Sequence, residues 1–404
     1  METARRHDAG MNLTINAHGQ RLPAGALERV GMNFPTRSRS RDTCAAAVND
    51  GTREVAIMNM WMKDMTGDMN IRQRQEAQEE AFLSPFASLS SKTRGRQRPE
   101  PECDIRPAYQ RDRDRILHCK AFRRMKHKTQ VFLAPRGDHY RTRLTHTLEV
   151  SQIARTIAKA LGLNESLTEA IALGHDLGHT PFGHTGEEIL GKICPYGFKH
   201  YEQSVRVVEL LEKKGRGLNL TWEVRDGMHN HSTANMPATL EGKVVRLSDK
   251  IAYINHDIDD AIRGQIISEA EIPAEYADIL GHSSRERLNT MVHNIIKNSW
   301  GIDAITMSED VEAAMIGLRR YMFDHVYTNP KAKGEEAKAQ NLLKTLYEYY
   351  MSKPEDMSEE YRLLILEMGE PKPRVVCDYI AGMTDQYAIS IYEELCIPSA
   401  WKIF

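Results

Sequence analysis

Residues 174–187 read GHDLGHTPFGHTGE, a run that places three imidazoles and two carboxylates within a few turns of chain. Side chains of these types gather where a divalent metal is held or where protons are moved. His175 and Asp176 point about 100° apart if they lie on a helix, so the adjacent pair is weak evidence alone. The evidence for a metal site becomes stronger if other His and Asp residues from elsewhere in the chain complete the coordination sphere.

Two further segments supply such residues, each within a pattern of helical spacing. His146 precedes apolar residues at helical intervals, and Asp249 lies in an apolar stripe that runs through residues 244–258. Asp249, Tyr253 and Asp257 follow one another at i, i+4 and form a second stripe. One stripe can therefore face the core while the other faces a cavity, as a pocket-lining helix requires.

The chain after residue 73 is helical in character, with Pro and Gly mostly in connections. Ser166 and Thr185 each begin a capping-box pattern, and Pro181 should break the chain between them. Residues 129–133 form the best strand candidate, in a small hairpin with residues 139–140. We expect helices near 76–82, 110–126, 146–162, 167–178, 185–193, 200–214, 221–228, 240–264, 273–281, 285–299, 307–326, 334–352, 357–367 and 372–395.

Composition narrows the class of protein. The chain has 404 residues, a formal net charge of -2 and 27% charged residues, so no global basic field indicates a dedicated nucleic-acid binder. No apolar run reaches transmembrane length and no signal peptide is recognisable, so we expect a cytoplasmic protein without a membrane partner. The six cysteines are scattered without CxxC pairs and are interpreted as reduced thiols.

The order His, His-Asp, Asp on consecutive helices resembles the HD-domain metal phosphohydrolases. Longer blocks resemble the bacterial deoxyguanosinetriphosphate triphosphohydrolase-like family, from about Met69 to the C-terminus. These blocks are DRDRIL (112–117), KAFRRMKHKTQV (120–131), DHYRTRLTH (138–146), the 174–187 run, HYEQS (200–204), DKIAYINHD (249–257) and DYIAGMTD (378–385). The resemblance implies a mainly α HD-domain phosphohydrolase fold with a helical C-terminal elaboration and at most a small hairpin.

Four regions follow from this comparison. Residues 1–68 lack a sustained apolar period and are expected to be an upstream extension from a misassigned start codon or a disordered regulatory arm. Residues 69–140 form a basic helical segment, 141–265 the HD phosphohydrolase core, and 266–404 a helical C-terminal region.

By the resemblance, the metal ligands are His146, His175, Asp176 and Asp249. Two nitrogens and at least two carboxylate oxygens leave room for water and a substrate oxygen. Such an open, mixed site suits Mg²⁺, Mn²⁺, Fe²⁺ or Co²⁺ better than a closed structural zinc site. Any one of these residues taken alone could be a buried histidine or a helix-capping aspartate.

The resemblance also matches four residues to catalysis. Thr185 would start a new helix with Glu187 in its first turn, where a carboxylate is favoured. His184 and Glu187 would then position and deprotonate a water. His179 and His200 match histidines that contact phosphate. The alternative for Glu187 is that it stabilises the helix start, and packing roles stay open for His179 and His200.

Substrate contacts are expected from five residues. Arg143, one helical turn before His146, and Lys250 are the best phosphate-binding candidates. Most other cations of residues 92–128 are expected to form surface ion pairs. A tyrosine near C2′ would exclude a ribose 2′-hydroxyl. By the resemblance, the residues that line the deoxyribose site are Gln130, Tyr253 and Asp257.

The resemblance implies metal-dependent hydrolysis of dGTP or a wider set of dNTPs to deoxynucleoside and inorganic triphosphate. It also implies a homo-oligomer and an allosteric nucleotide, and weak binding of single-stranded DNA could coexist as regulation. One alternative is an HD phosphohydrolase that acts on nucleoside monophosphates or cyclic nucleotides. The other is a non-catalytic sensor of nucleotides or single-stranded DNA, which predicts a damaged metal set.

Overall fold

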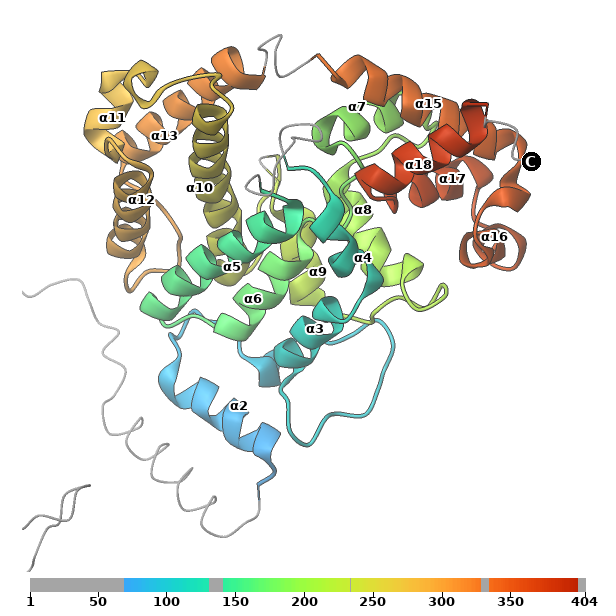
Figure 1. Ribbon diagram of the computed structural model, residues 1–404. Helices are drawn as coiled ribbons and strands as arrows, with labels where there is room; N and C mark the ends of the chain where they lie inside the picture. Colours follow the sequence, from blue (N-terminus) through green and yellow to red (C-terminus); the bar gives the residue numbers. More distant parts are fainter. Residues whose placement is uncertain (1–68, 131–140, 233, 328–333, 399–404) are drawn as a thin grey trace, which may run out of the picture. The chain divides into compact units, whose positions relative to one another are not determined.

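The described chain consists mainly of α-helices joined by turns and loops, with the long segment between residues 82 and 108 mostly outside helices (Figure 1). The computed structural model describes residues 69–130, 141–232, 234–327 and 334–398. Its helices are α2 (Ile71–Phe82), α3 (Ala108–Leu117), α4 (Lys120–Arg124), α5 (Arg143–Ala160), α6 (Glu165–Gly174), α7 (Gly183–Ile193), α8 (His200–Arg206), α9 (Trp222–Asn230), α10 (Leu240–Arg263), α11 (Ala274–Leu280), α12 (Ser284–Ser299), α13 (Glu309–Met322), α15 (Glu336–Ser352), α16 (Glu359–Leu366), α17 (Lys372–Ala381) and α18 (Asp385–Cys396). The predicted mainly α fold is confirmed.

Extended pairing among the described residues is limited to isolated bridges. Thr129 pairs with Thr142 in an antiparallel bridge, and Arg96 pairs with Thr221. The predicted hairpin partner, residues 139–140, and most of the predicted strand lie outside the described residues. The first residue of that strand therefore pairs with the residue that precedes α5.

Side-chain caps decide where the site-bearing helices begin. Thr142 accepts a hydrogen bond from the backbone of Thr145 and forms a capping box at the start of α5. The predicted box at Ser166 is wrong, because Asn164 caps α6 instead and accepts from two backbone N–H groups. The box predicted at Thr185 is wrong as well, since α7 already begins at Gly183, after Phe182 in a left-handed conformation.

Two helices predicted as continuous are broken by local caps. The expected helix 110–126 splits at Cys119, whose side chain accepts from the backbone N–H of Phe122 and starts α4. The expected helix 372–395 splits before Thr384, which caps α18 through the N–H of Tyr387. A side chain that can accept at the new N-terminus makes each break favourable.

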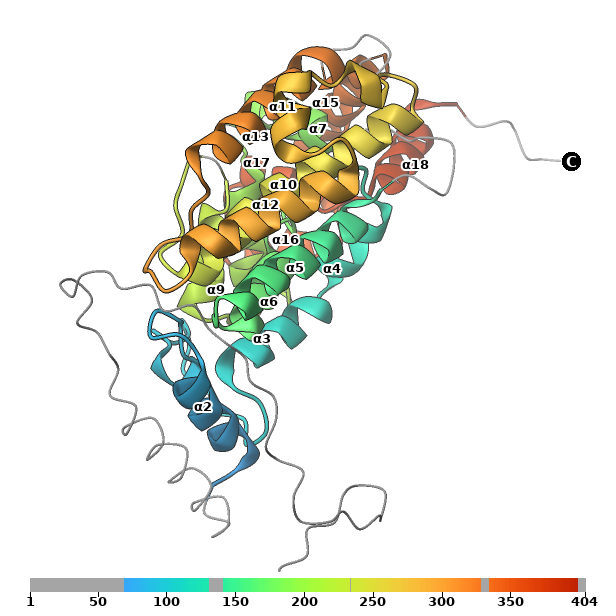
Figure 2. The same ribbon diagram turned by 90° about the vertical axis from the view of Figure 1, so that its left-hand side faces the viewer.

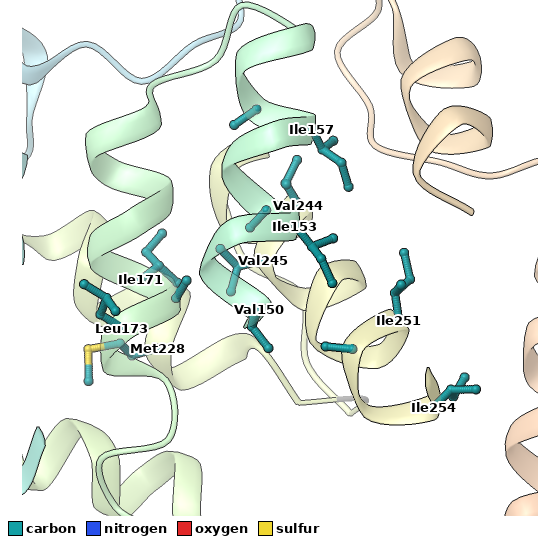
Figure 3. Close-up of a cluster of buried hydrophobic side chains, with 14 of the residues drawn as sticks. Val150, Ile153, Ile157, Ile171, Leu173, Met228, Val244, Val245, Ile251 and Ile254 are labelled. Carbon is teal, nitrogen blue, oxygen red and sulfur yellow. The ribbon is translucent and has the colours of Figure 1, made fainter. Parts of the chain in front are cut away.

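The core that carries the site forms where α5, α6, α9 and α10 pack together. Val150, Ile153 and Ile157 of α5 meet Val244 and Ile251 of α10, and all five side chains are buried (Figure 3). Truncating one such isoleucine to alanine costs about 2 to 5 kcal/mol. Because α5 and α10 are held by this packing, the polar stripes on both helices keep fixed positions beside the site.

A second apolar cluster joins α7 to α15, α17 and α18. Leu190 of α7 packs among side chains that include Leu343, Leu346 and Val376. Figures 1 and 2 also show α12 beside α5 and α10, which it contacts. All described residues belong to one unit that spans residues 51–404. None of its described helices is long and apolar enough to cross a membrane.

Candidate metal and active site

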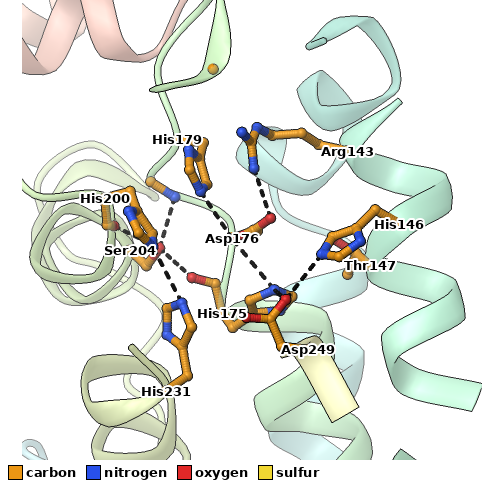
Figure 4. A network of polar contacts seen from close by, with 12 residues as sticks. Arg143, His146, Thr147, His175, Asp176, His179, His200, Ser204, His231 and Asp249 are labelled. Carbon is orange, nitrogen blue, oxygen red and sulfur yellow. Dashed lines mark hydrogen bonds and ion pairs between the residues drawn. The ribbon is translucent and has the colours of Figure 1, made fainter. Parts of the chain in front are cut away.

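The four predicted metal ligands come together from three helices (Figure 4). His146 lies on α5 and Asp249 on α10, whereas His175 and Asp176 occupy the turn that follows α6. His146 Nε2 is 3.1 Å from Asp249 Oδ1. His175 Nε2 is 3.3 Å from Asp176 Oδ1 and 3.7 Å from Asp249 Oδ1. Ring nitrogens and carboxylate oxygens therefore converge on one point.

The surroundings of His175 prepare it to bind a cation. Its Nδ1 lies 2.7 Å from the carbonyl oxygen of Ala172, so Nδ1 keeps its proton and Nε2 is the nitrogen that can bind a metal once it is deprotonated. No described residue forms a hydrogen bond with that buried Nε2. An orphaned buried nitrogen between two carboxylates fits a divalent metal. Burial alone would lower the pKa of His175, but Asp176 and Asp249 raise it to about 9 in the metal-free protein.

A glycine and a serine fix the turn that carries this pair. The N–H of Gly178 donates to Ser204 Oγ at 2.9 Å, and the same hydroxyl lies 2.7 Å from the carbonyl oxygen of His175. A Cβ on Gly178 would lie 2.2 Å from the backbone nitrogen of Ser204. The close approach of α8 therefore requires a glycine here.

The predicted catalytic residues form a second polar group beside the first. Glu187 lies in the second turn of α7, not the predicted first turn, because that helix begins earlier. Its carboxylate accepts from the backbone N–H of His200 and lies 3.0 Å from His200 Nδ1. His184 is 66% exposed, with Nδ1 3.4 Å from Glu187. The ring of His179 stacks on that of His200 at 4.1 Å and its Nε2 reaches Asp176 Oδ1 at 3.2 Å.

Hydrogen bonding keeps Glu187 ionised. Burial alone would raise the pKa of its carboxyl, but contacts with His184 and His200 outweigh burial and lower that pKa below its usual range. A carboxylate that is ionised and held by two histidines can orient or deprotonate a water.

Both groups open into a cavity of about 170 Å³. Of the predicted substrate-binding residues, Gln130, Arg143, Lys250 and Tyr253 line it. Arg143 is buried and donates from Nη1 to Asp176 Oδ2 at 2.9 Å. Asp257 is fully buried on α10 and does not belong to the described residues that line the cavity. Its role at the sugar stays a prediction.

Other cations of the basic segment pair with carboxylates. Arg113 Nη1 is 3.3 Å from Glu169, and Arg115 Nη2 is 2.6 Å from Glu100. Such partly exposed pairs contribute about 0 to 1 kcal/mol each to stability. Arg113 and Arg115 thus form the expected ion pairs, whereas Lys128 of the same segment is buried.

Two residues anchor the loop between α6 and α7 to the C-terminal helices. The buried Lys128 donates from Nζ to the carbonyl oxygens of His179 and Ala381. Burial lowers the pKa of that amine well below its usual value. Asp385 accepts from the N–H of Phe182 at 3.0 Å. The position of His179 therefore depends on α17 and α18.

Three cavity residues, His231, Ser232 and Arg319, were not found from the sequence. His231 follows the last residue of α9, and its Nε2 lies 3.3 Å from His200 Nε2. Arg319 reaches the cavity from α13. His231 and Ser232 belong to a polar run at the end of α9, and Arg319 lies on α13. Only the packing of these helices places the three residues at the cavity.

Sequence comparisons agree with this geometry. The HD-domain family model matches residues 143–254, and the phosphohydrolase-associated domain matches residues 305–394. A deoxyguanosinetriphosphate triphosphohydrolase-like protein of Caldanaerobacter subterraneus subsp. tengcongensis is 56% identical over 333 residues, which cover 82% of this chain and 98% of the relative. A protein of the same description from Desulfatibacillum aliphaticivorans is 47% identical over 348 residues, which cover 82% and 99%.

A solved structure of a hypothetical protein from Aquifex aeolicus aligns with 72% of this chain and 69% of its own, at 20% identity and a TM-score of 0.41. The matches to the two curated relatives cover 98% and 99% of those relatives' own length. With its His and Asp cluster in an all-helical HD domain, the chain belongs to the deoxyguanosinetriphosphate triphosphohydrolase-like family of HD phosphohydrolases.

Proposed function

We propose that this protein hydrolyses 2′-deoxynucleoside triphosphates, dGTP or a wider set, to deoxynucleoside and inorganic triphosphate. One observation carries the proposal: three of the four predicted metal ligands, His146, Asp176 and Asp249, line the same cavity as three cationic side chains. The cations are Arg143, Lys250 and Arg319. A triphosphate carries several negative charges, so its site needs both a metal and cations.

The metal would be held by His146, His175, Asp176 and Asp249. Their donor set fits Mn²⁺, Mg²⁺, Fe²⁺ or Co²⁺, and the buried Nε2 of His175 has no hydrogen-bond partner among the described residues. A divalent ion bound there supplies Lewis acidity toward phosphate oxygens.

The cationic wall would bind and orient the phosphates. Arg143 uses Nη1 for Asp176, and a guanidinium has five N–H donors, so it retains donors for a phosphate oxygen. Burial lowers the pKa of Lys250, which lies beside Asp249 on α10. Charge that develops on the phosphates would be stabilised by these preorganised donors.

His184 and Glu187 would together position and deprotonate the attacking water. His200 holds the carboxylate through its backbone N–H and Nδ1, while His184 reaches the same carboxylate from the solvent side. His179, between Asp176 and the ring of His200, would contact phosphate. A base fixed by other groups loses less entropy when the water is positioned.

Selection for deoxyribose would come from Tyr253, one turn after Asp249 on α10, with Gln130 across the cavity. A tyrosine against C2′ leaves no room for a ribose hydroxyl. Replacing Tyr253 by alanine should lower the preference for dGTP over GTP, measured as the ratio of the two kcat/KM values. The decrease should be roughly 10-fold to 200-fold if the shape of the pocket alone discriminates. An unchanged ratio would remove Tyr253 from this role.

The central test measures the products of each dNTP with Mn²⁺ or Mg²⁺. We expect inorganic triphosphate, its loss in Asp249→Asn, and full activity in the control Asp278→Asn, which alters an exposed carboxylate on α11. Release of pyrophosphate or single phosphates would contradict the proposed cut. Turnover of only monophosphates or cyclic nucleotides would replace the substrate class.

Homo-oligomerisation, activation by a nucleotide and weak single-stranded DNA binding are further proposals from the family resemblance. Light scattering with and without dNTPs tests the first two. A mobility shift repeated at increasing salt tests the third, because phosphate contacts weaken as salt rises. A monomer with dNTP-independent kinetics and no shift would refute all three.

A further inference from the structure

A hollow of about 1000 Å³ lies at the surface formed by α3, α4 and the start of α16, and it shares no lining residue with the catalytic cavity (Figure 1). Segments 98–106 and 212–219 complete its wall, and we call it the basic groove. Nine lysine and arginine side chains line it against four carboxylates, although the whole chain has a formal net charge of -2. Such a local positive field attracts a ligand with many negative charges.

Carboxylates neutralise only part of this charge. Glu100 binds the guanidinium groups of Arg111 and Arg115 at 3.2 and 2.6 Å, and Glu360 binds Nζ of Lys120 at 2.6 Å. Five other cations of the groove are exposed and form no ion pair with any described residue. They are Arg98, Arg123, Lys213, Lys214 and Arg216. Their charges therefore remain available to an anionic ligand.

Three of these five cations lie on a loop with a strained backbone. Lys213 and Lys214 have φ angles of 56° and 57°, in the left-handed region that residues other than glycine rarely adopt. Arg98 donates from Nη2 to the carbonyl oxygen of Arg216, which ties the loop to segment 98–106. Strained backbone of this kind persists where the surrounding structure holds it, and it is concentrated at functional sites. The loop thus holds its cations in place before a ligand arrives.

The groove offers a ligand little besides charge and polarity. Among the described residues that line it, only Pro99, Gly217 and Leu218 lack a polar side chain. No described Phe, Tyr or Trp lines it, so the bases of a single-stranded nucleic acid would find no aromatic side chain to stack on. A protein partner or a lipid chain would find no apolar surface to cover. The lining therefore favours a ligand that is anionic along its whole length.

We infer that the basic groove binds inorganic polyphosphate, a linear chain of phosphates without sugars or bases. Each phosphate unit carries negative charge, and guanidinium and ammonium groups form charge-assisted hydrogen bonds with phosphate oxygens. The contacts would come from Arg98, Arg123 and the loop cations Lys213, Lys214 and Arg216. Binding here does not depend on the proposed hydrolysis of dNTPs, because the two cavities have no residue in common.

The test measures binding of sodium polyphosphate of one chain length by isothermal titration calorimetry, without nucleotide. If five cations each contact one phosphate, the affinity should fall roughly 100-fold between about 50 and 200 mM salt, with the exponent of about 0.7 per contact known for single strands. The triple variant Lys213→Asn, Lys214→Asn, Arg216→Gln should bind more weakly at low salt, and its affinity should fall only roughly sevenfold over that range. Asparagine tolerates the left-handed backbone, so these changes remove charge without added strain.

The matched control removes three exposed charges outside the groove, through Lys159→Gln, Lys338→Gln and Lys344→Gln. It should bind polyphosphate as the wild type does. Absence of binding to the wild type, or equal losses in the two triple variants, would overturn the inference. Displacement of polyphosphate by dGTP would overturn it as well, because the ligand would then lie in the catalytic cavity. Tighter binding of a single-stranded DNA of equal charge in the same groove would replace polyphosphate by nucleic acid.

Lysine acetylation tests the site in the wild-type protein and does not require that a variant folds. With polyphosphate bound, Lys213 and Lys214 should be protected from acetylation while Lys159 reacts as before, as quantified by mass spectrometry. Unprotected Lys213 and Lys214 at saturating polyphosphate would overturn the inference. Hydrolysis of dNTPs is measured on the same samples. Triphosphate release without polyphosphate binding would refute the groove alone, whereas polyphosphate binding without triphosphate release would refute the proposed function alone.

Discussion

Asp385 is the first residue of α18, yet it holds the loop that precedes α7. Its carboxylate accepts from the N–H of Phe182 at 3.0 Å and from the N–H of Thr129 at 2.9 Å, and it also binds the Thr129 hydroxyl. Replacing Asp385 by alanine leaves both backbone donors without this acceptor. We expect the variant to lose stability and to release the loop that carries His179.

The magnitude follows from these contacts. A buried N–H left without a partner costs about 1 to 3 kcal/mol, and loss of the hydroxyl contact costs about 1 kcal/mol. Taking about 2 for the buried Phe182 donor and about 1 for the half-buried Thr129 donor, the free energy of unfolding should fall by about 4 kcal/mol. Thr129→Val removes only the hydroxyl contact and should cost about 1 kcal/mol. Domains with 5 to 15 kcal/mol of stability remain folded after either change.

The assay combines urea unfolding with steady-state hydrolysis well below the melting temperature. A displaced catalytic loop should lower kcat of Asp385→Ala roughly tenfold to a hundredfold. The control Glu394→Ala removes an exposed carboxylate from the same helix and should change stability by less than about 0.5 kcal/mol. Equal losses in Asp385→Ala and Thr129→Val would refute the anchoring argument. A loss of 4 kcal/mol with unchanged kcat would mean that the anchor holds the fold but not the catalytic loop.

Three other predictions concern the metal site and its turn. With its pKa raised to about 9, protonated His175 stabilises the metal-free fold at low pH, and this stabilisation is lost as pH rises through about 9. Metal binding must displace that proton, so calorimetry in two buffers at pH 7.5 should show about one proton released and an affinity that rises toward pH 9; pH-independent affinity would contradict this. Gly178→Ala places a Cβ within 2.2 Å of a backbone nitrogen in α8 and should cost roughly 3 kcal/mol in urea unfolding, unlike the control Gly191→Ala in α7. Arg143→Ala strands a buried carboxylate and should cost about 3 to 5 kcal/mol without metal. The loss should be smaller with Mn²⁺ present, and equal losses with and without Mn²⁺ would argue against a metal beside that carboxylate.

Helix spacing was enough to predict the fold, but the helix ends depended on individual side chains. The helix predicted over 240–264 agrees closely with α10, because one apolar stripe runs along its whole length. The helix predicted over 372–395 hides a break at Thr384, where the apolar pattern continues but a hydroxyl caps a new helix. The spacing of apolar residues indicates which face of a helix is buried, but it carries little information on where caps begin or end the helix.

The four metal ligands could be predicted from the sequence because each lies in a recognisable flanking pattern, and the structure places them together. His231 and Arg319 carry no such pattern, and they reach the cavity only through the packing of α9 and α13. For Asp257 the spacing predicted too much. Its i, i+8 spacing from Asp249 places it on the same stripe of α10, but two turns further along the helix, where its side chain is fully buried. The distance of a side chain from a cavity depends on where the neighbouring helices end. The residue spacing within one helix carries no information on those positions.

The buried amine of Lys128 limits which segments of the gene can be exchanged by recombination. It donates to the carbonyl oxygen of His179, in the loop between α6 and α7, and to the carbonyl oxygen of Ala381 at the end of α17, within the matched phosphohydrolase-associated segment. Recombination that replaced residues 305–394 with an unrelated helical segment would leave this amine with an unfilled donor in a dry interior, at a cost of about 1 to 3 kcal/mol. The two segments that sequence comparison recognises separately are thus coupled through Lys128, a residue that lies outside both of them.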